Sequence, residues 1–313
     1  MHYAYPPRKD SHPPPFRPRR SRMPMIRRSQ VKTIALFLIF VLGIIFLFSG
    51  SSKQKARSRT ITGKPPVVIV TVFDEKYANT AYSMQIKDNR QQYADKHGYK
   101  LLIAEAEDYE LLGAPSSWAK VVAMRHAITK YPDAKYIWYL DQHALIMNPN
   151  LKIEEHVMST SRLEGLVKKN HPVVPPMSII KTFDHQTPSD VDAVVTQDKE
   201  GIATNSLIVR NGEWAKFFLD TWFDPMYRSY NFAKAERHAL EHIVQWHPTI
   251  LSNLAIIPQR TINAYTTTKE GAQYKDGDLA VTFPECTVSG DKSCAKTAEK
   301  YAQQWRKAFR AKY

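Results

Sequence analysis

The sequence predicts an α/β fold, with a mainly parallel sheet flanked by helices and a single transmembrane helix near the N-terminus. Three observations lead to this expectation. Short, β-branched apolar runs typical of buried strands alternate with longer segments of helical character. Thr33–Phe48 is a run of sixteen residues without a charge. Residues 65–313 are long enough to enclose an ample hydrophobic core.

The N-terminal segment carries almost all of the net charge of +14. Residues 1–64 hold fourteen basic residues and one acidic residue, which leaves 30 basic and 29 acidic residues in 65–313. This near neutrality argues against a nucleic-acid-binding domain, and we expect no nucleic-acid partner. Residues 1–32, rich in Arg and Pro, lack the apolar surface needed to fold, so we predict a disordered cytoplasmic tail.

Residues 33–49 are predicted to be a transmembrane signal anchor, although the apolar run is near the lower limit of about 17–25 residues for a span. Nine basic residues precede the run and five follow it before Pro65. This excess predicts a cytoplasmic N-terminus, a stem at residues 50–64 and a lumenal domain at residues 65–313. A cleaved signal peptide is the alternative; the long pre-sequence and the lack of a clear small-x-small cleavage site argue against it. A short span suits a thin early secretory membrane.

The first half of the lumenal segment alternates strands with helices. Val67–Phe73 is a buried parallel strand by its β-branched residues. A helix is predicted next at Asn79–His97, and it ends at Gly98, which is a typical helix C-cap. The elements predicted after it are, in order, strand Tyr99–Ala104, helix Ser116–Tyr131 and strand Tyr136–Leu140.

The second half is predicted to contain fewer strands. Ser206–Val209 is a short strand, and Glu213–Trp222 and Ala233–Trp246 are helices. The helical spacing of the aromatic residues in Glu213–Trp222 places them in the core. The region Leu254–Val281 is predicted to be loop-rich with short extended pieces. Cys286 and Cys294 either form a local disulfide, as an oxidising lumen favours, or remain two free thiols.

The most informative segment is Tyr136–Pro149, in which Asp141 and His143 follow the apolar strand. Side chains two apart on an extended backbone point the same way. Ligands of parallel α/β sheets bind beyond the carboxyl ends of the strands, where Asp74 also falls. Asp141 and His143 are therefore predicted to hold a divalent cation, and through it a diphosphate. The alternative is a charged strand end that simply meets solvent.

At this point the chain resembles the Golgi glycosyltransferases of family 34 in fungi and plants, and most closely the fungal α-1,6-mannosyltransferases that serve as mannan polymerase subunits. The resemblance covers roughly residues 66–286. It rests on an ordered series of motifs: Asn89-Arg90-x-x-Tyr93-Ala94-x-x-His97-Gly98-Tyr99, Trp118-Ala119-Lys120, Trp138-Tyr139-Leu140-Asp141-Gln142-His143, Gln197-Asp198, Asn205-Ser206-x-x-x-Arg210-Asn211-x-x-Trp214 and Ala239-Leu240-Glu241.

The resemblance implies a GT-A-like fold that binds a nucleotide sugar and Mn²⁺. It implies metal ligation by Asp141 and His143, and catalytic or sugar-lining roles for Asp198, Asn205 and Glu241. The residues implied to bind the nucleotide sugar are Thr71, Asp74, Asn89, Arg90, Lys120 and Asp141. Lys120 is expected to face the donor phosphates.

Two departures from the family pattern affect the metal site. His143 stands where the family has a second carboxylate, and Thr282 stands where the family has its third metal ligand, a histidine, with Glu285 nearby. The resemblance implies a Golgi type II membrane enzyme that transfers mannose from GDP-mannose to mannan or N-glycan acceptors, in α-1,6 linkage and in complex with other mannosyltransferase subunits. The alternatives are a weakly or non-catalytic structural subunit and a UDP-galactose-dependent galactosyltransferase.

Overall fold

The structure, a computed structural model, describes residues 32, 36–41, 61–174, 178–269 and 271–310. The chain divides into two units, Met1–Arg59 and Thr60–Tyr313. Most of the predicted tail, membrane anchor and stem lies outside the described residues. Within the described part, no helix is both long enough and apolar enough to cross a membrane.

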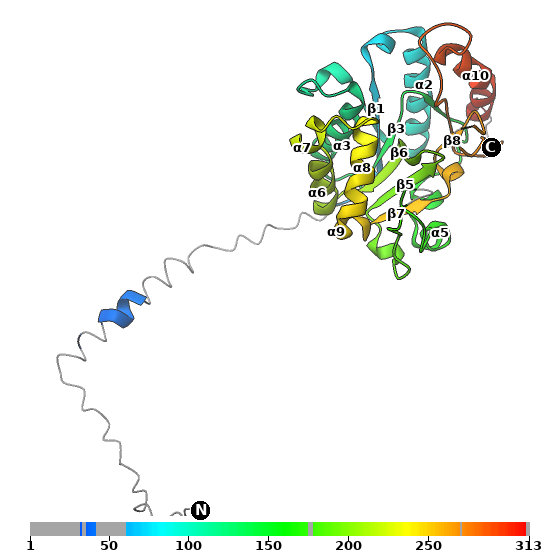
Figure 1. The fold of residues 1–313 in the computed structure, drawn as a ribbon. Helices are drawn as coiled ribbons and strands as arrows, with labels where there is room; N and C mark the ends of the chain where they lie inside the picture. The colour runs from blue at the N-terminus through cyan, green and yellow to red at the C-terminus, as the bar shows by residue number, and fades with distance from the viewer. Residues whose placement is uncertain (1–31, 33–35, 42–60, 175–177, 270, 311–313) are drawn as a thin grey trace, which may run out of the picture. The chain divides into compact units, whose positions relative to one another are not determined.

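A six-stranded mixed sheet forms the centre of the second unit (Figure 1). The strand order is β2 (Lys100–Glu105), β1 (Val67–Phe73), β3 (Tyr136–Leu140), β6 (Gly201–Arg210), β5 (Ala193–Asp198) and β7 (Leu254–Ile257). β1 pairs in parallel with β2 and β3, and β5 pairs in parallel with β7, whereas β6 is antiparallel to both of its neighbours. The mainly parallel α/β sheet is therefore confirmed.

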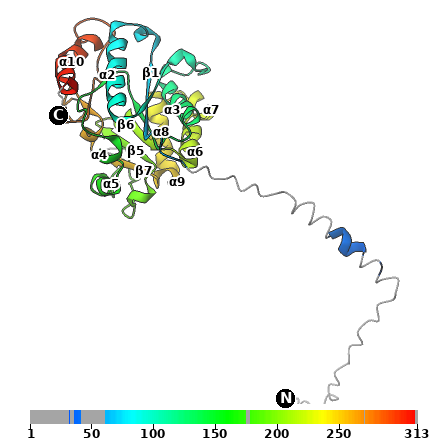
Figure 2. The same ribbon diagram turned by 180° about the vertical axis from the view of Figure 1, so that it is seen from behind.

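The alternation of side chains along each strand builds a core on both faces of this sheet. In β1, Val68 and Val70 join the core on one face, while Val67 and Ile69 join the core on the other. Figures 1 and 2 show helices on both sides. The first face is covered by α3 (Ala119–Lys130), α6 (Glu213–Trp222), α8 (Ala235–Trp246) and α9 (Pro248–Leu251), and the second by α2 (Ala81–His97), α4 (Ile153–His156) and α5 (Thr160–Leu166).

A second, three-stranded sheet lies beside the carboxyl end of β3. Its order is β4 (Ala144–Ile146), β9 (Ala280–Thr282) and β8 (Ala264–Tyr265). The C-terminal helix α10 (Cys294–Arg310) packs against α2 and β4, and α7 (Pro225–Ser229) packs against α8. This small sheet brings residues from the end of the chain next to the turn that follows β3.

The boundaries of β1, β3 and α6 agree with the prediction. Helix α2 starts at Ala81, because Thr80 and Ser83 form a capping box there, and it ends at Gly98 with φ 67°. The first turn predicted for α3 is a separate 3-10 turn, Ser116–Trp118. β6 is longer than predicted, and β5 and α10 were not predicted at all. The predicted local disulfide Cys286–Cys294 is present.

Candidate active site

The end of β3 continues into a tight turn that positions Asp141. The backbone N–H of Asp141 donates to the carbonyl of Asn205 (2.8 Å), because Leu140 pairs with Ser206 in the neighbouring strand β6. The carboxylate of Asp141 accepts hydrogen bonds from the backbone N–H of His143 (2.8 Å) and the hydroxyl of Tyr139 (3.2 Å). The premise that Asp141 and His143 lie on extended backbone is therefore wrong. A side-chain-to-backbone hydrogen bond bends the chain into a turn there instead.

Three residues predicted to bind the nucleotide sugar hold this turn in place through hydrogen bonds to its backbone and that of the adjoining strands. Arg90, fully buried, donates to the carbonyls of Asp141 (3.1 Å) and Ala144 (2.9 Å). Asn89 bonds to both the N–H and the carbonyl of Ile146. The hydroxyl of Thr71, also fully buried, donates to the carbonyl of Leu140 (2.8 Å). These side chains are committed to backbone groups, so the structure places them as supports of the turn.

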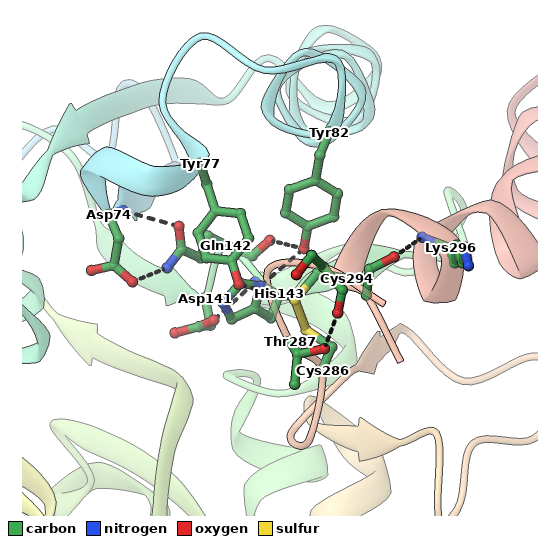
Figure 3. The surroundings of a disulfide bond; sticks show 12 residues. Asp74, Tyr77, Tyr82, Asp141, Gln142, His143, Cys286, Thr287, Cys294 and Lys296 are labelled. Atoms are coloured by element: carbon green, nitrogen blue, oxygen red, sulfur yellow. Dashed lines mark hydrogen bonds between the residues drawn. A yellow bond between two sulfur atoms is a disulfide. The ribbon is translucent and has the colours of Figure 1, made fainter. Parts of the chain in front are cut away.

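Asp74 lies at the carboxyl end of β1, as predicted, and is tied to the same turn. The Gln142 side chain donates to the Asp74 carboxylate (2.7 Å) and accepts from the Asp74 backbone N–H (3.0 Å). The Ser116 hydroxyl donates to the other carboxylate oxygen (2.7 Å). Figure 3 shows Asp74 and Gln142 facing each other beside Asp141.

The imidazole of His143 sits against two tyrosine rings. Its Nδ1 lies 3.0 Å from the hydroxyl of Tyr82, which donates its proton to the carbonyl of Gln142 (2.8 Å), so Nδ1 carries the proton between them (Figure 3). Burial lowers the pKa of His143, which keeps the ring neutral. The remaining nitrogen, Nε2, is then an unprotonated lone pair, the form in which histidine binds metals.

Cys286 and Cys294 lie on the other side of His143. One ring nitrogen and the two sulfurs fall within 4.8 Å of one another. Since the sulfurs are joined in a disulfide, this group is not a metal site. The Tyr77 ring stacks edge-on against His143 at 4.8 Å, and its hydroxyl lies 3.3 Å from the Cys294 sulfur. The disulfide therefore packs directly behind the turn.

A polar cleft of about 330 Å³ opens at the same edge of the sheet. Asp198 ends β5, Asn205 lies beside Asp141 in β6, and Tyr265 comes from β8. Residues from four separate parts of the chain thus meet here. The lining residues are Asp198, Glu200, Asn205, Arg237, Tyr265, Pro284 and Glu285.

Glu241 lies beside this cleft on α8 and supports the β5–β6 turn. Its carboxylate accepts a hydrogen bond from the backbone N–H of Ile202 (2.9 Å). Burial raises the pKa of Glu241, and this effect outweighs the Ile202 hydrogen bond and the charge of Arg237. Gly201 is required at the turn because a Cβ there would lie 2.1 Å from a Glu241 oxygen, and its φ is +133°.

Lys120 lies on the first turn of α3, but it is buried. Its ammonium forms an ion pair with Glu236 (2.7 Å) and donates to the hydroxyl of Thr204 (3.2 Å). Burial alone would raise the pKa of Glu236. The charge and hydrogen bond of Lys120 act in the opposite direction, and the net pKa of Glu236 lies below its ordinary value. The structure therefore places Lys120 inside the protein, paired with Glu236, rather than on an open surface facing phosphates.

Thr282 cannot replace the family histidine as a ligand. Its side chain is fully buried, and its hydroxyl donates to the Asn263 side chain (2.8 Å). Glu285, three residues later, is exposed at the cleft. Sequence reasoning missed Arg237 and Tyr265 in this cleft. The available signal was the spacing of Arg237 and Glu241, which places them on the same face of α8.

Comparisons with known proteins show the family of this chain. Residues 63–293 match the model of the galactosyl transferase GMA12/MNN10 family. The chain belongs to this family. It is a glycosyltransferase with a GT-A-like fold, and the family implies a nucleotide-sugar donor and a glycan acceptor.

Similar proteins carry two different activities in their names. An uncharacterized alpha-1,2-galactosyltransferase of Schizosaccharomyces pombe is 32% identical over 82% of this chain and 80% of its own length. An alpha-1,2-galactosyltransferase of the same organism is 33% identical over 75% of this chain and 65% of its own length. The Saccharomyces cerevisiae protein named "Probable alpha-1,6-mannosyltransferase MNN11" is 31% identical over 74% of this chain and 60% of its own length.

One solved structure supports the fold. A glycosyltransferase involved in the glycosylation of the major capsid of PBCV-1 superposes with a TM-score of 0.54 at 14% identity, covering 75% of this chain and all of that chain. The likeness concerns the GT-A-like architecture alone.

Proposed function

We propose that this glycosyltransferase transfers mannose from GDP-mannose to a mannan or N-glycan acceptor, forming an α-1,6 linkage. The observation that carries the proposal is the position of Asp141. It directly follows a buried central strand, and its backbone N–H bonds to the carbonyl of Asn205, which lines the polar cleft at the sheet edge. Sugar nucleotides bind at this edge in α/β sheets because the carboxyl ends of the strands converge there.

The residues at the turn fit a divalent cation such as Mn²⁺ in type. Each oxygen of Asp141 accepts one hydrogen bond and keeps a further lone pair, and His143 is neutral with Nε2 unprotonated. Asp141 and His143 would hold the cation, whereas the buried Thr282 would not take part. A bound cation neutralises the charge of a departing nucleotide diphosphate as a Lewis acid.

The other polar groups act on the sugars. The Asp198 carboxylate stabilises the positive charge that develops at the anomeric carbon, and the Asn205 amide orients a sugar hydroxyl. Arg90 and Asn89 hold the Asp141 turn at a fixed position against β4. Preorganised groups of this kind contribute more inside a protein cleft than in water, because they need not reorganise during the reaction.

A second donor, UDP-galactose, is favoured by the relatives named alpha-1,2-galactosyltransferases at 32–33% identity. The full chain in detergent micelles would be assayed with each donor, Mn²⁺ and a mannoside acceptor, and the released nucleotide measured. We expect GDP release from GDP-mannose; turnover with UDP-galactose alone would assign the second activity.

Asp141→Asn is expected to lower the rate roughly 10²–10³-fold. Asp88→Asn, on the exposed face of α2, is the matched control and should leave the rate unchanged. The buried Thr282 favours one further reading, a structural subunit of a mannosyltransferase complex. If Asp141→Asn cells elongate their glycans normally while deletion of the gene stops elongation, the chain is structural and the catalytic proposal is wrong.

We further propose a Golgi location with type II topology, anchored by residues 33–49. The support is the uncharged run between two unequal groups of basic residues. Deleting residues 1–50 should release the protein into the soluble fraction after centrifugation. A truncated protein that still pellets with membranes would contradict a single N-terminal anchor.

A further inference from the structure

The carboxylate of Asp198 accepts four hydrogen bonds from groups of the protein. One carboxylate oxygen accepts from the backbone N–H of Glu200 (2.8 Å) and from Arg237; the other accepts from the second terminal nitrogen of Arg237 (3.1 Å) and from the hydroxyl of Tyr265 (2.8 Å). A carboxylate offers about four lone-pair positions, and all four are filled here. The side chain is only 3% exposed.

Arg237 is the one cationic partner of Asp198 in this arrangement, and it is itself buried. Its side chain is 13% exposed, and both terminal nitrogens of its guanidinium donate to Asp198 in a bidentate pair. Its Nε is buried without a hydrogen-bond partner among the described residues, 3.7 Å from Glu241. Burial lowers the pKa of Arg237, but the hydrogen bonds and charge of Asp198 raise it above normal, so the cation is permanent.

Further charged groups surround the pair on α8, in the β5–β6 turn and after β9. Glu241 lies on α8 with Arg237, and Glu200 lies in the β5–β6 turn, where Lys234 also contacts it (2.7 Å). Glu285 also lines the cleft. Carboxylates therefore outnumber the cations Arg237 and Lys234 around the cleft, and of these two cations Arg237 is the one that bonds directly to Asp198.

We propose that Arg237 is a positioning residue of the transfer reaction, which fixes the direction of the Asp198 carboxylate so that its charge faces the anomeric carbon. This rests on the proposed function of the cleft. A carboxylate whose lone pairs are all occupied is a poor nucleophile, so Asp198 acts through its charge. The bidentate fork of Arg237, which a lysine cannot reproduce, fixes the direction of that charge.

The test compares the full chain with Arg237→Gln and Arg237→Lys. Arg237→Gln is expected to lower kcat by about 10²-fold, with KM changed far less, because the Asp198 carboxylate is no longer held in position. The acid limb of its kcat profile should also move to higher pH, because the cleft loses a cation while keeping its carboxylates. Arg237→Lys should restore the pH profile and only part of kcat, since it returns the charge without the fork.

Arg260→Gln is the matched control. Arg260 also forms a bidentate pair, through Nε and one terminal nitrogen, with Asp278 (3.0 and 2.8 Å), and neither residue lines the cleft. This variant should keep the wild-type kcat and pH profile. An Arg237→Gln enzyme with wild-type kcat and an unshifted acid limb would overturn the proposal, as would a loss of activity fully explained by unfolding at the assay temperature.

A stability measurement separates this proposal from the function on which it rests. The unfolding midpoint of Arg237→Gln should lie below that of the wild type at pH 7, and the gap should narrow toward pH 4.5 as the unpaired carboxylates are protonated. If the wild type shows no turnover with either donor but the gap narrows, the proposed function fails while the pairing stands. A gap independent of pH overturns the pairing itself.

Discussion

Lys120→Met is the substitution that most directly tests how this structure uses its buried charges. Lys120 and Glu236 are 8% and 5% exposed and lie 2.7 Å apart. Removing the lysine leaves Glu236 buried without its cation, with neutral partners such as the hydroxyl of Thr204 (3.3 Å) and the side chain of Ser117. Breaking a buried ion pair from one side typically costs about 3–5 kcal/mol. For a domain of this size, that corresponds to a fall in Tm of roughly 6–20 °C.

The assay is thermal unfolding of the full chain in detergent, followed by circular dichroism. The double variant Lys120→Met/Glu236→Leu should recover most of the loss, because it removes both charges together. Lys216→Met, whose partner Glu213 is exposed to solvent, is the surface control and should unfold like the wild type.

The pH dependence has a definite sign. The pKa of Glu236 in the folded protein is held below its ordinary value of 4.5, so the ion pair stabilises the fold above that pH. The stabilisation is lost as the pH falls through the lowered folded-state pKa. The gap in Tm between the wild type and Lys120→Met should therefore be full at neutral pH and close in acid. If Lys120→Met unfolds within about 1 °C of the wild type but raises the KM for the nucleotide sugar, Lys120 faces the donor and the buried-pair reasoning is refuted.

Two further substitutions test the supports of the cleft and the turn. In Gly201→Ala, backbone strain at φ +133° should destabilise the protein by about 1–3 kcal/mol, and the clash with Glu241 should add to this loss. Gly212 has an extended φ and open space around it, so Gly212→Ala should change the Tm little. Equal effects of the two substitutions would contradict this account. Replacing Cys286 and Cys294 by Ala should cost about 2–3 kcal/mol by the loop-entropy estimate for a separation of eight residues, measured by urea unfolding. If the double variant keeps wild-type stability but has reduced turnover, the disulfide positions the Asp141 turn and does not stabilise the fold.

Much of the fold could be predicted because its strands are short runs of β-branched residues with one possible environment. Val67–Phe73 and Tyr136–Leu140 are apolar on both faces, so they fit only a sheet buried on both sides. β5 could not be recognised with the same ease, since Ala193–Asp198 ends in polar residues that resemble a loop. The direction of β6 depends on the short β5–β6 turn, and the sequence pattern of the strand itself does not encode direction.

The site was predicted less completely than the fold. The sequence placed Asp74 and Asp141 at strand ends, and the structure confirms those positions. It did not predict that Arg90, Asn89 and Thr71 would bond to backbone groups of the turn, because those contacts join residues 51 to 69 positions apart. Predictions based on residue type assign such buried polar groups to ligands as readily as to backbone.

By itself, the sequence determined the alternation of buried strands and amphipathic helices, since local apolar patterns depend only on neighbouring residues. It also fixed the separation between a basic N-terminal segment and a nearly neutral domain. Only the tertiary structure decided which charges meet: Lys120 finds Glu236 across 116 positions, and Asp198 finds Arg237 across 39. Such pairs depend on how strands and helices pack in space. How far a buried side chain favours its charged form depends on that environment rather than on its place in the chain.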